Sequence, residues 1–362
     1  MKILLLVAGS RSGSDFFQSL VDGHNEICQF PGLIHYNNRF KKLFLINNLE
    51  ELALNFISQY PHFFNSKNAI LERHNKLGKN KNEFYIISKK KFVKEFIQLM
   101  KKNKKNDFNI LKCLHLAFSL SSKEKINNKK IILINIHLVN YASKFVSDFR
   151  NYNIEILHTI RNPLSAISSP VKNWLKYKKG KNFGPAAFFF HFNLVLQGIS
   201  DLQNLKKKIK IIQLEKVHKK NKSVMKDFCK IYKIKFNPNL SKSTFQKKLW
   251  WGDEISQKYL NGVNKNYKIS IEKKLFFEKD LIYFNYIFKN IINFYGYKLY
   301  LKQDKFKWFY FLPLKIEMLI LLNSLKLKNF KHIILFPIYY LLRIYKTLTL
   351  NKNLKSFPNS IG

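Results

Sequence analysis

Residues 1–21 contain an apolar run, a turn rich in glycine and serine, and a helical segment in immediate succession. The run at residues 2–8 is short and continuously apolar, which is typical of a parallel strand covered on both faces. It is too short for the apolar part of a signal peptide, and no small-residue cleavage site follows it. The turn at residues 9–13 precedes residues 14–21, which have helical character. The start of the chain therefore predicts a buried strand, an anion-binding turn and a helix.

Two more apolar runs of strand length lie at residues 131–137 and 154–160. The segment between them, residues 139–150, has apolar residues at helical spacing, so the three segments predict a strand, a helix and a second parallel strand. A further strand is expected at residues 209–214, after a helix at residues 188–205. The predicted fold class is therefore α/β, with a P-loop-like, doubly wound central parallel sheet flanked by helices and a helical C-terminal extension.

The chain divides into two parts by composition. Residues 1–300 hold the predicted sheet, and within them residues 39–106 are rich in Lys and Asn and are predicted to form a helical insertion over one side of the sheet. Residues 301–362 alternate apolar runs with lysines, and none of the runs reaches the roughly 18 uncharged apolar residues expected of a spanning helix. This tail fits two alternatives: amphipathic helices on an anionic membrane surface with Trp308 at headgroup depth, or a helical subdomain packed on the sheet.

The chain carries a strong positive charge. Lys and Arg number 65 against 22 Asp and Glu, a formal net charge of +43, which favours anionic partners such as nucleotides, phosphorylated or sulfated glycans, nucleic acid or anionic lipid. A compositional bias toward Lys and Asn on solvated surfaces accounts for the charge equally well. The basic residues are dispersed and are not interleaved with aromatic residues on one platform, so we expect that nucleic acid is not the partner.

The three cysteines, Cys28, Cys113 and Cys229, lie far apart and form no Cys-x-x-Cys pair. They indicate neither a disulfide framework nor a zinc site, and we expect no metal. Cysteines of this kind are typical of a reducing compartment. The expected location is therefore the cytoplasm, and the tail allows peripheral attachment to the inner face of the membrane.

The turn after the first strand has the composition of an anion site. Its residues are Gly9, Ser10, Arg11, Ser12, Gly13, Ser14, Asp15 and Phe16. Between a strand and a helix, successive backbone N–H groups and the helix dipole converge on an anion such as phosphate or sulfate. A Walker A loop would carry a lysine after its second glycine, but Gly13 is followed by serine, so a nucleotide-dependent kinase is the weaker alternative.

The loop resembles the 5'-phosphosulfate-binding loop of the sulfotransferases that use 3'-phosphoadenosine 5'-phosphosulfate (PAPS). In that superfamily a Lys or Arg and then Ser-Gly-Thr/Ser precede a helix, and this pattern is matched by Arg11, Ser12, Gly13 and Ser14. Residues 20–27, Leu-Val-Asp-Gly-His-Asn-Glu-Ile, resemble the next segment of the tyrosylprotein branch and of the bacterial branch that includes polysaccharide and lipopolysaccharide sulfotransferases. Asp15 departs from the pattern, since the family has a second hydroxyl residue there.

A second stretch resembles the same superfamily. Residues 155–160 form a predicted strand that ends in Arg161-Asn162-Pro163, and proline suits the first turn of the helix that follows. In the family an Arg at this strand end and a Ser on the helix hold the 3'-phosphate of the nucleotide. Arg161 and Ser169 are eight residues apart, as in the family, and the resemblance implies this role for both.

A third stretch, residues 243–253, resembles the late basic loop that closes over the nucleotide in this family. The resemblance implies that Lys247 or Lys248 contributes charge at the 3'-phosphate and that Trp250 or Trp251 packs against donor or acceptor, next to the loop glycine Gly252. Which of these residues takes which role stays open.

Sulfuryl transfer is an in-line reaction in which catalysis is chiefly positioning and stabilisation of charge on the bridging oxygen of the leaving nucleotide, a role that suits Arg11. The acceptor hydroxyl must also lose a proton, and histidine is the side chain best suited to accept it near neutral pH. His137 is the first choice because it ends the strand before the Arg161 strand, at the edge where open α/β sheets place their active sites. His35 is the second choice, His115 and His24 are third, and His158 is expected to be packing within a strand.

The resemblance therefore implies a PAPS-dependent sulfotransferase, whose acceptor we expect to be a cell-envelope saccharide or glycolipid, with an anionic membrane surface as a further partner. The alternatives are a nucleotide-dependent kinase of P-loop-like fold and a non-enzymatic basic protein that binds nucleic acid or membrane. The sequence leaves the acceptor, the position of sulfation and the oligomeric state open.

Overall fold

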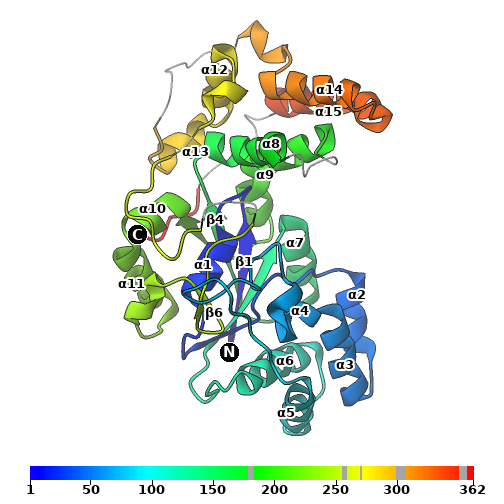
Figure 1. The fold of residues 1–362 in the computed structure, drawn as a ribbon, viewed down its shortest axis with the longest axis vertical. Helices are drawn as coiled ribbons and strands as arrows, with labels where there is room; N and C mark the ends of the chain where they lie inside the picture. Colours follow the sequence, from blue (N-terminus) through cyan, green and yellow to red (C-terminus); the bar gives the residue numbers. More distant parts are fainter. Residues whose placement is uncertain (178–182, 255–258, 270, 299–306, 350–356) are drawn as a thin grey trace.

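A parallel five-stranded sheet lies at the centre of the computed structural model, which describes residues 1–177, 183–254, 259–269, 271–298, 307–349 and 357–362 (Figure 1). The strands are β1 (Lys2–Ala8), β2 (Ile27–Gln29), β3 (Ile131–His137), β4 (Ile154–Ile160) and β5 (Lys208–Gln213). Their order in the sheet is β2-β3-β1-β4-β5. The predicted α/β fold with a central parallel sheet is confirmed. Of the five strands, the short edge strand β2 was not predicted.

Both faces of the sheet are covered. Along β1, Ile3, Leu5 and Val7 belong to one hydrophobic cluster and Leu4 and Leu6 to another, because successive side chains of a strand point to opposite faces. This explains the continuous apolar run at the start of the chain. Since β1 pairs with β3 on one side and β4 on the other, the turn that follows it lies at the middle of the strand-end edge.

Helices connect the strands on both sides. On the two faces lie α1 (Ser14–Leu20), α6 (Asp107–Ser121), α7 (Val139–Asp148), α8 (Pro163–Tyr177), α9 (Pro185–Gln203), α10 (Leu214–Lys219) and α11 (Asn221–Tyr232). The clusters show the division: Phe17 of α1 and Phe228 of α11 share one cluster, whereas Phe145 of α7 and Leu202 of α9 belong to the other. The sheet is therefore doubly wound, as predicted.

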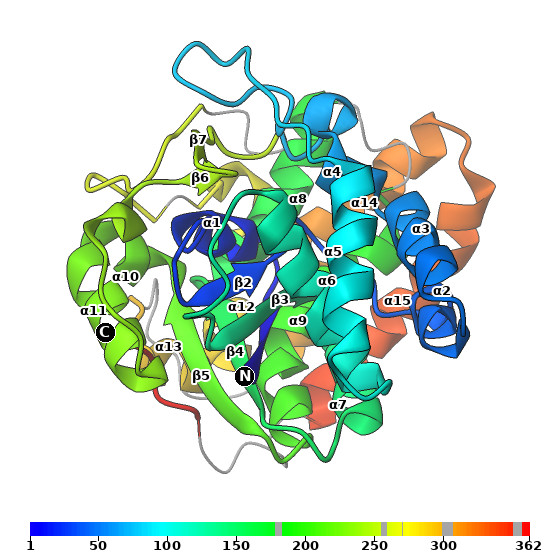
Figure 2. The same cartoon turned by 90° about the horizontal axis from the view of Figure 1, so that it is seen from below.

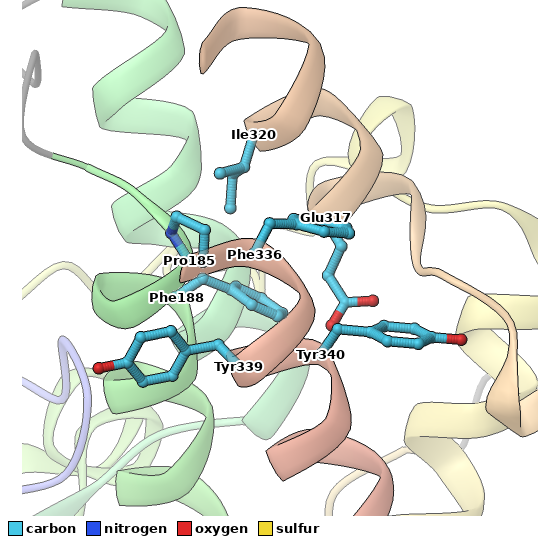
Figure 3. A pocket seen from close by; sticks show the side chains of 7 residues that line it. All are labelled: Pro185, Phe188, Glu317, Ile320, Phe336, Tyr339 and Tyr340. Carbon is cyan, nitrogen blue, oxygen red and sulfur yellow. The ribbon is translucent and has the colours of Figure 1, made fainter. Parts of the chain in front are cut away.

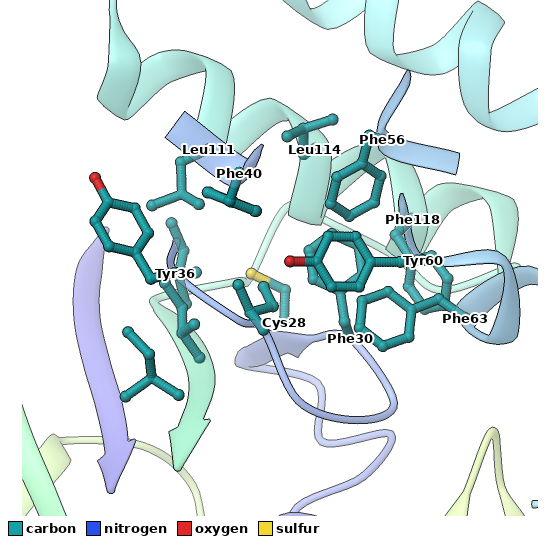
Figure 4. Close-up of a cluster of buried hydrophobic side chains, with 14 of the residues drawn as sticks. Cys28, Phe30, Tyr36, Phe40, Phe56, Tyr60, Phe63, Leu111, Leu114 and Phe118 are labelled. Atoms are coloured by element: carbon teal, nitrogen blue, oxygen red, sulfur yellow. The ribbon is translucent and has the colours of Figure 1, made fainter. Parts of the chain in front are cut away.

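The segment between β2 and α6 forms an aromatic subdomain on the β2 side of the sheet. Its helices are α2 (Asn38–Lys41), η1 (Lys42–Leu45), α3 (Leu49–Gln59), α4 (Pro61–Phe64), η2 (Ser66–Asn68) and α5 (Lys89–Lys101). Figure 4 shows Phe30, Phe56, Phe63 and Phe118 converging near Cys28. Residues 69–88 between η2 and α5 form turns and isolated bridges rather than helix.

A short hairpin lies beside α1 and this subdomain (Figure 2). It consists of β6 (Thr244–Phe245) and β7 (Lys248–Leu249), preceded by η3 (Pro238–Ser241). The Gly78 amide donates to the carbonyl of Leu249 over 2.9 Å, and the Thr244 hydroxyl donates to Asp22 over 2.9 Å. The hairpin therefore joins the insertion to the C-terminal end of α1.

The C-terminal region is helical. It comprises η4 (Lys273–Leu275), α12 (Glu278–Ile287), α13 (Lys289–Phe294), η5 (Trp308–Phe311), α14 (Lys315–Lys326) and α15 (Phe330–Thr349). The domain boundary expected between residues 300 and 301 lies outside the described residues. Ile316 and Ile320 of α14 share a hydrophobic cluster with Leu164 of α8 and Phe192 of α9, so this region packs on the helices above the sheet. Residues 357–362 return to β5, where the Ile361 amide donates to Ile211 over 2.9 Å.

One segment of the described residues, Trp308–Lys326, is long and apolar enough to cross a membrane by length and composition, with a mean hydropathy of 1.3. A third of that segment, 33%, is buried inside the protein, and the core helix of a soluble protein meets the same criteria.

Candidate functional site

The loops that follow β1 and β4 leave the sheet side by side. Ala8 pairs with Thr159 at the ends of the two strands, and the Gly9 amide donates to the Thr159 carbonyl over 2.8 Å. Adjacent parallel strands are about 4.8 Å apart. Because Arg11 comes two residues after Gly9 and Arg161 two residues after Thr159, the two predicted anion-binding corners lie at the same edge of the sheet.

The first loop has the backbone of an anion-binding turn. Gly13 precedes α1 with φ of +82° and Arg11 has φ of +48°, so the chain turns through two left-handed residues before the helix. Glycine is required at position 13, where the conformation is left-handed and where a Cβ atom would lie 2.6 Å from Leu214. The first N–H groups of α1 have no partner within the helix and are therefore free to bind an anion.

Two serine side chains hold the loop instead of facing outward. The Ser12 hydroxyl donates to the Gly9 carbonyl over 2.7 Å and lies 2.8 Å from the Thr159 hydroxyl. The Ser10 hydroxyl donates to the Ala166 carbonyl of α8 over 3.1 Å. These contacts join the first loop to the second one and to the helix that follows it.

Each of the two arginines offers an unsatisfied donor. Within the described part of the chain, the Nε atoms of Arg11 and Arg161 are buried and have no hydrogen-bond partner. Nη2 of Arg11 lies 3.4 Å from the carboxylate of Asp253, which comes from the late loop. Because guanidinium N–H groups are donors only and a buried donor without an acceptor is costly, both side chains are suited to bind an anion.

A stack of flat rings borders Arg161. His218 lies between Phe16 and Tyr267, with ring centroids 4.6 Å apart on each side and interplanar angles of 19° and 12°. Burial and, to a smaller extent, the charge of Arg161 lower the pKa of His218 to about 4, so the ring is neutral at pH 7. Phe16 was predicted to contribute to the site, but His218 and Tyr267 were not, because nothing in the sequence near either residue links it to the loop.

Glu215 organises the base of the second corner. Its Oε1 atom accepts a hydrogen bond from the Asn162 amide over 2.8 Å, and Oε2 accepts one from the Tyr297 hydroxyl over 3.2 Å. The pKa of Glu215 is raised above its ordinary value because the side chain is buried. These hydrogen bonds and the charge of Arg161 offset part of that rise. Ser169 lies on α8, two turns into the helix that begins after Arg161.

His137 lies against the first loop. Its Nδ1 atom is 3.2 Å from the Ser14 hydroxyl, and its backbone has φ of +60°, a strained conformation for a histidine at a strand end. The pKa of His137 is lowered from its ordinary value, chiefly because the ring is buried. The carboxylate of Asp15 opposes this shift, and the charges of Arg11 and His35 add to it. A neutral imidazole beside a carboxylate and facing the loop is able to accept a proton.

Asp15, predicted as part of the anion-binding loop, is hydrogen-bonded to the neighbouring strand. Its Oδ1 atom accepts a hydrogen bond from Asn135 of β3 over 2.9 Å, and Asn135 also donates to Gln18 over 2.9 Å. The carboxylate thus lies beside His137 and is tied to the neighbouring strand. This placement also suits the positive end of the α1 dipole.

The other predicted histidines lie in different surroundings. His35 is exposed, with its ring 6.0 Å from that of Tyr141. His24 lies beyond the far end of α1, where its Nε2 atom is 2.9 Å from the Lys235 carbonyl. His115 and His158 are buried, and their rings are hydrogen-bonded to the backbone carbonyls of Leu111 and Val7. Of these four histidines, His35 is the one that contributes to lowering the pKa of His137.

A histidine that was not predicted also lies at the loop. Nδ1 of His191, on α9, is 2.9 Å from the Ser10 hydroxyl. Burial and, to a smaller extent, Arg11 and His137 lower the pKa of His191 to about 4. The one sequence signal for this residue is that a histidine interrupts an otherwise apolar helical segment, which is too weak to assign a role.

In this structure the basic and aromatic side chains of the late loop contact the insertion and the end of α1. Lys248 forms an ion pair with Glu83, and the side chain of Lys247 lies over Gly23 beyond the end of α1. Trp250 is buried, and its indole N–H donates to the Glu72 carbonyl over 2.6 Å. Gly252, next to Asp253, has φ of +81°. Asp253 contacts the first loop through Arg11.

A groove of about 500 Å³ runs between α7 and α9, and Leu138, the residue after His137, is part of its lining. Leu138 and Val139 contribute apolar side chains to its lining, and Phe190 contributes an aromatic ring. The polar side chains along it are Asn140, Ser143, Asn193, Asp201 and Asn204. Among the described residues that line this groove there is no Lys or Arg, although the chain as a whole has a net charge of +43.

Comparisons with known proteins gave matches among solved structures. No family model matches the chain, and no curated protein matches it. The sulfotransferase domain from the curacin biosynthetic pathway is similar with a TM-score of 0.39 and 14% identity, over 82% of this chain and 98% of that domain. The sulfotransferase domain from the Synechococcus PCC 7002 olefin synthase is similar with a TM-score of 0.36 and 12% identity, over 66% of this chain and 75% of that one.

Proposed function

We propose that this protein transfers a sulfuryl group from PAPS to a hydroxyl group of an acceptor. The observation that carries the proposal is the pair of buried Nε donors on Arg11 and Arg161, which lack partners among the described residues. The two arginines lie on loops that leave neighbouring strands and are joined by hydrogen bonds. A nucleotide that carries anionic groups on both its 5' and 3' sides provides acceptors for two such donors at once.

The residues divide into two groups in this proposal. On the 5' side, the backbone of residues 9–16 and the side chains of Arg11 and Ser14 hold the phosphosulfate. On the 3' side, Arg161 and Ser169 hold the phosphate. The rings of Phe16, His218 and Tyr267 stack on one another next to Arg161, and we place the purine base against an outer ring of this stack. Lys247, Lys248, Trp250 and Gly252 stay candidates for a loop that closes over the nucleotide.

The reaction makes two demands on the protein's own residues. PAPS supplies an activated sulfuryl group, whose bond to the bridging phosphate oxygen breaks as a bond from sulfur to the acceptor oxygen forms. His137 accepts the proton of the acceptor hydroxyl, and Arg11 stabilises the negative charge that remains on the bridging oxygen. Asp15 favours the protonated form of His137 after the transfer, since a nearby carboxylate raises the pKa of that histidine.

The acceptor is proposed to be a saccharide or the saccharide part of a glycolipid. The groove between α7 and α9 supports this choice because it includes Leu138, the residue after His137, and combines amide, hydroxyl and carboxylate side chains with the ring of Phe190. Sugars are commonly bound through such hydrogen-bonding groups together with an apolar ring surface. The absence of Lys and Arg among its described lining residues disfavours an anionic acceptor in the groove.

A cytoplasmic location is part of the proposal. Cys28, Cys113 and Cys229 are all free and buried, which suits a reducing compartment.

Calorimetry with adenosine 3',5'-bisphosphate tests the nucleotide site. The wild-type protein should bind the bisphosphate more tightly than adenosine 5'-monophosphate, because only the former places a phosphate at Arg161. In the Arg161→Ala variant this preference should fall by about 10- to 100-fold, the size expected for a lost hydrogen bond to a charged group.

Arg150→Ala is the matched control, since Arg150 is exposed at the end of α7. It removes the same charge from the surface and should leave both affinities unchanged. Equal binding of the two nucleotides by the wild type, or an unchanged preference in Arg161→Ala, would contradict the proposal.

A further inference from the structure

The α14–α15 pair has one covered face and one open face. The covered face packs on α9: Figure 3 shows Pro185 and Phe188 of α9 meeting Ile320 of α14 and Tyr339 and Tyr340 of α15. The remaining space between these side chains is about 10 Å³, little more than a water molecule occupies. The inner side of the helix pair is therefore filled by the protein itself.

The open face of α15 carries a stripe of exposed apolar side chains. They recur every three or four residues and so lie on one side of the helix. These residues are Phe330, Ile334, Ile338, Leu341, Tyr345 and Leu348. Their exposed fractions run from 50% at Ile338 to 71% at Phe330. Nothing in the described part of the chain covers this stripe.

The neighbouring helix α14 adds a second stripe. Met318, Leu322 and Leu325 are exposed at the same spacing, and Trp308 in η5 is exposed as well. Of the 25 large apolar side chains that are exposed among the described residues, 13 lie between Trp308 and Leu348. Such concentration marks an interaction surface, because apolar residues scattered singly over a soluble protein would not gather on one helix pair.

The charges around the two stripes indicate which partner fits. Lys326, Lys328 and Lys331 surround the turn between α14 and α15, and Lys307 and Lys315 lie at the other end of α14. Glu317, the one carboxylate of residues 307–349, is buried in an ion pair with Arg343. The open face is thus apolar with a basic rim.

A second copy of the chain is disfavoured as the partner, since each copy carries a net charge of +43 and the rim would face another basic rim. An anionic bilayer offers the complementary charge together with an apolar interior. We propose that the open face of the α14–α15 pair binds the surface of a bilayer that contains anionic lipid, with both helices lying parallel to the membrane.

The length of α14 and the charges of α15 favour lying on the bilayer over crossing it: α15 has 20 residues and reaches about 30 Å, but it carries Lys331, Arg343 and Lys346. The 12 residues of α14 span about 18 Å, whereas the hydrocarbon core of a bilayer is about 30 Å thick. The Glu317–Arg343 pair and the contacts with α9 would have to break for either helix to insert across the membrane. Trp308 and Tyr345, which are exposed, are residue types that settle at headgroup depth.

The bound surface would lie next to the candidate site. Tyr339 of α15 packs on Phe189 of α9 with ring centroids 5.6 Å apart, and His191 of α9 contacts Ser10 of the first loop. The body of α15 and the helix α9 therefore separate the open face from the loop (Figure 1). Membrane binding does not depend on the proposed sulfuryl transfer and is tested separately from it.

Vesicle sedimentation with the full-length protein tests the proposal. Vesicles of phosphatidylcholine mixed with phosphatidylglycerol should bind the wild type, and vesicles of phosphatidylcholine alone should bind it much more weakly. The triple variant Phe330→Ser, Ile334→Ser, Leu341→Ser should bind the mixed vesicles at least tenfold more weakly, because its apolar stripe is removed while every lysine is kept.

The control is the triple variant Leu54→Ser, Ile70→Ser, Ile86→Ser, which removes three equally exposed apolar side chains elsewhere on the surface. It should bind like the wild type, and circular dichroism should show that both variants are folded. Failure of the wild type to bind mixed vesicles, or equal binding by the stripe variant, would overturn the proposal. A wild-type dimer that becomes monomeric in the stripe variant would overturn it too, by identifying a second copy as the partner.

Discussion

At the scale of single residues, the candidate site is built from strained backbone positions. Arg11, Gly13 and His137 all have positive φ, and two of them are not glycine. Left-handed conformations are unfavourable for residues with a Cβ atom, so the surrounding hydrogen bonds must hold them. Ser12 and Thr159 do this for the loop. Of the ten described non-glycine residues with positive φ, Arg11 and His137 are the two at this edge of the sheet, and this placement agrees with the proposed roles.

His137→Ala tests the proposed base. Turnover of PAPS with the best acceptor from a panel of saccharides should fall by about 10²- to 10⁴-fold, since the variant lacks the group that accepts the proton. Affinity for adenosine 3',5'-bisphosphate should stay close to that of the wild type. In the wild type, turnover should decline only at a pH below about 6.5, because burial lowers the pKa of His137 from its ordinary value.

The matched variant for this test is His35→Ala, which removes the second candidate. If turnover falls in His35→Ala and stays unchanged in His137→Ala, then His35 is the base and the assignment to His137 is wrong.

At the scale of elements, the C-terminal helices depend on one buried ion pair. Nε of Arg343 in α15 donates to Glu317 of α14 over 2.8 Å, and its Nη atoms donate to the carbonyls of Tyr310 and Leu312 over 3.1 and 3.0 Å. The pKa of Glu317 is raised above its ordinary value because the carboxyl group is buried, and the charge of Arg343 offsets part of that rise. Arg343 thus joins η5, α14 and α15 from a position that is 1% exposed.

Arg343→Met should lower the free energy of unfolding by about 3–5 kcal/mol, because it leaves the Glu317 carboxylate and two carbonyl groups buried without their partner. Urea denaturation measures the loss. The double variant Arg343→Met, Glu317→Gln should lose less than Arg343→Met alone, since no charge is then left buried. Arg150→Met, at an exposed position, serves as the control, and a loss no larger than that of the control would show that the pair does not hold these helices together.

At the scale of the whole molecule, buried neutral histidines tie stability to pH. Burial lowers the pKa of His115 and of His158 to about 4, and the pKa of His74 to about 3. In the unfolded chain these groups titrate near 6.5, so acid protonates the unfolded state first. The stability that they contribute is complete above about pH 6.5 and is lost as the pH falls toward 4. The net charge of +43 adds self-repulsion in the same direction as carboxylates become protonated.

The midpoint of thermal unfolding should therefore fall steadily between pH 6.5 and 4.5 and stay nearly constant between pH 6.5 and 8. A pH series of thermal melts at fixed ionic strength measures this. A His115→Leu variant that folds should show a shallower decline below pH 6.5, and a wild-type midpoint that is independent of pH over the lower range would contradict the interpretation.

Local patterns in the chain were sufficient to predict its framework. Continuous apolar runs and glycine-serine turns have few other conformations open to them, so short stretches of sequence are enough to predict them. This applies to the strands at residues 2–8, 131–137 and 154–160 and to the turn at residues 9–13. The edge strand β2 escaped prediction because three residues are too few to show a pattern.

The side chains that meet at the loop could not be predicted in the same way. His191, His218, Tyr267 and Asp253 all lie more than 170 residues from the loop in the chain, and each reaches it through packing of α9, α10 or the segments after them. The same holds for the open face of the α14–α15 pair, since a helical stripe of apolar residues has the same sequence whether it is covered or exposed. Short-range propensity thus determines strands and turns, whereas contacts between distant segments arise only when the whole core has packed.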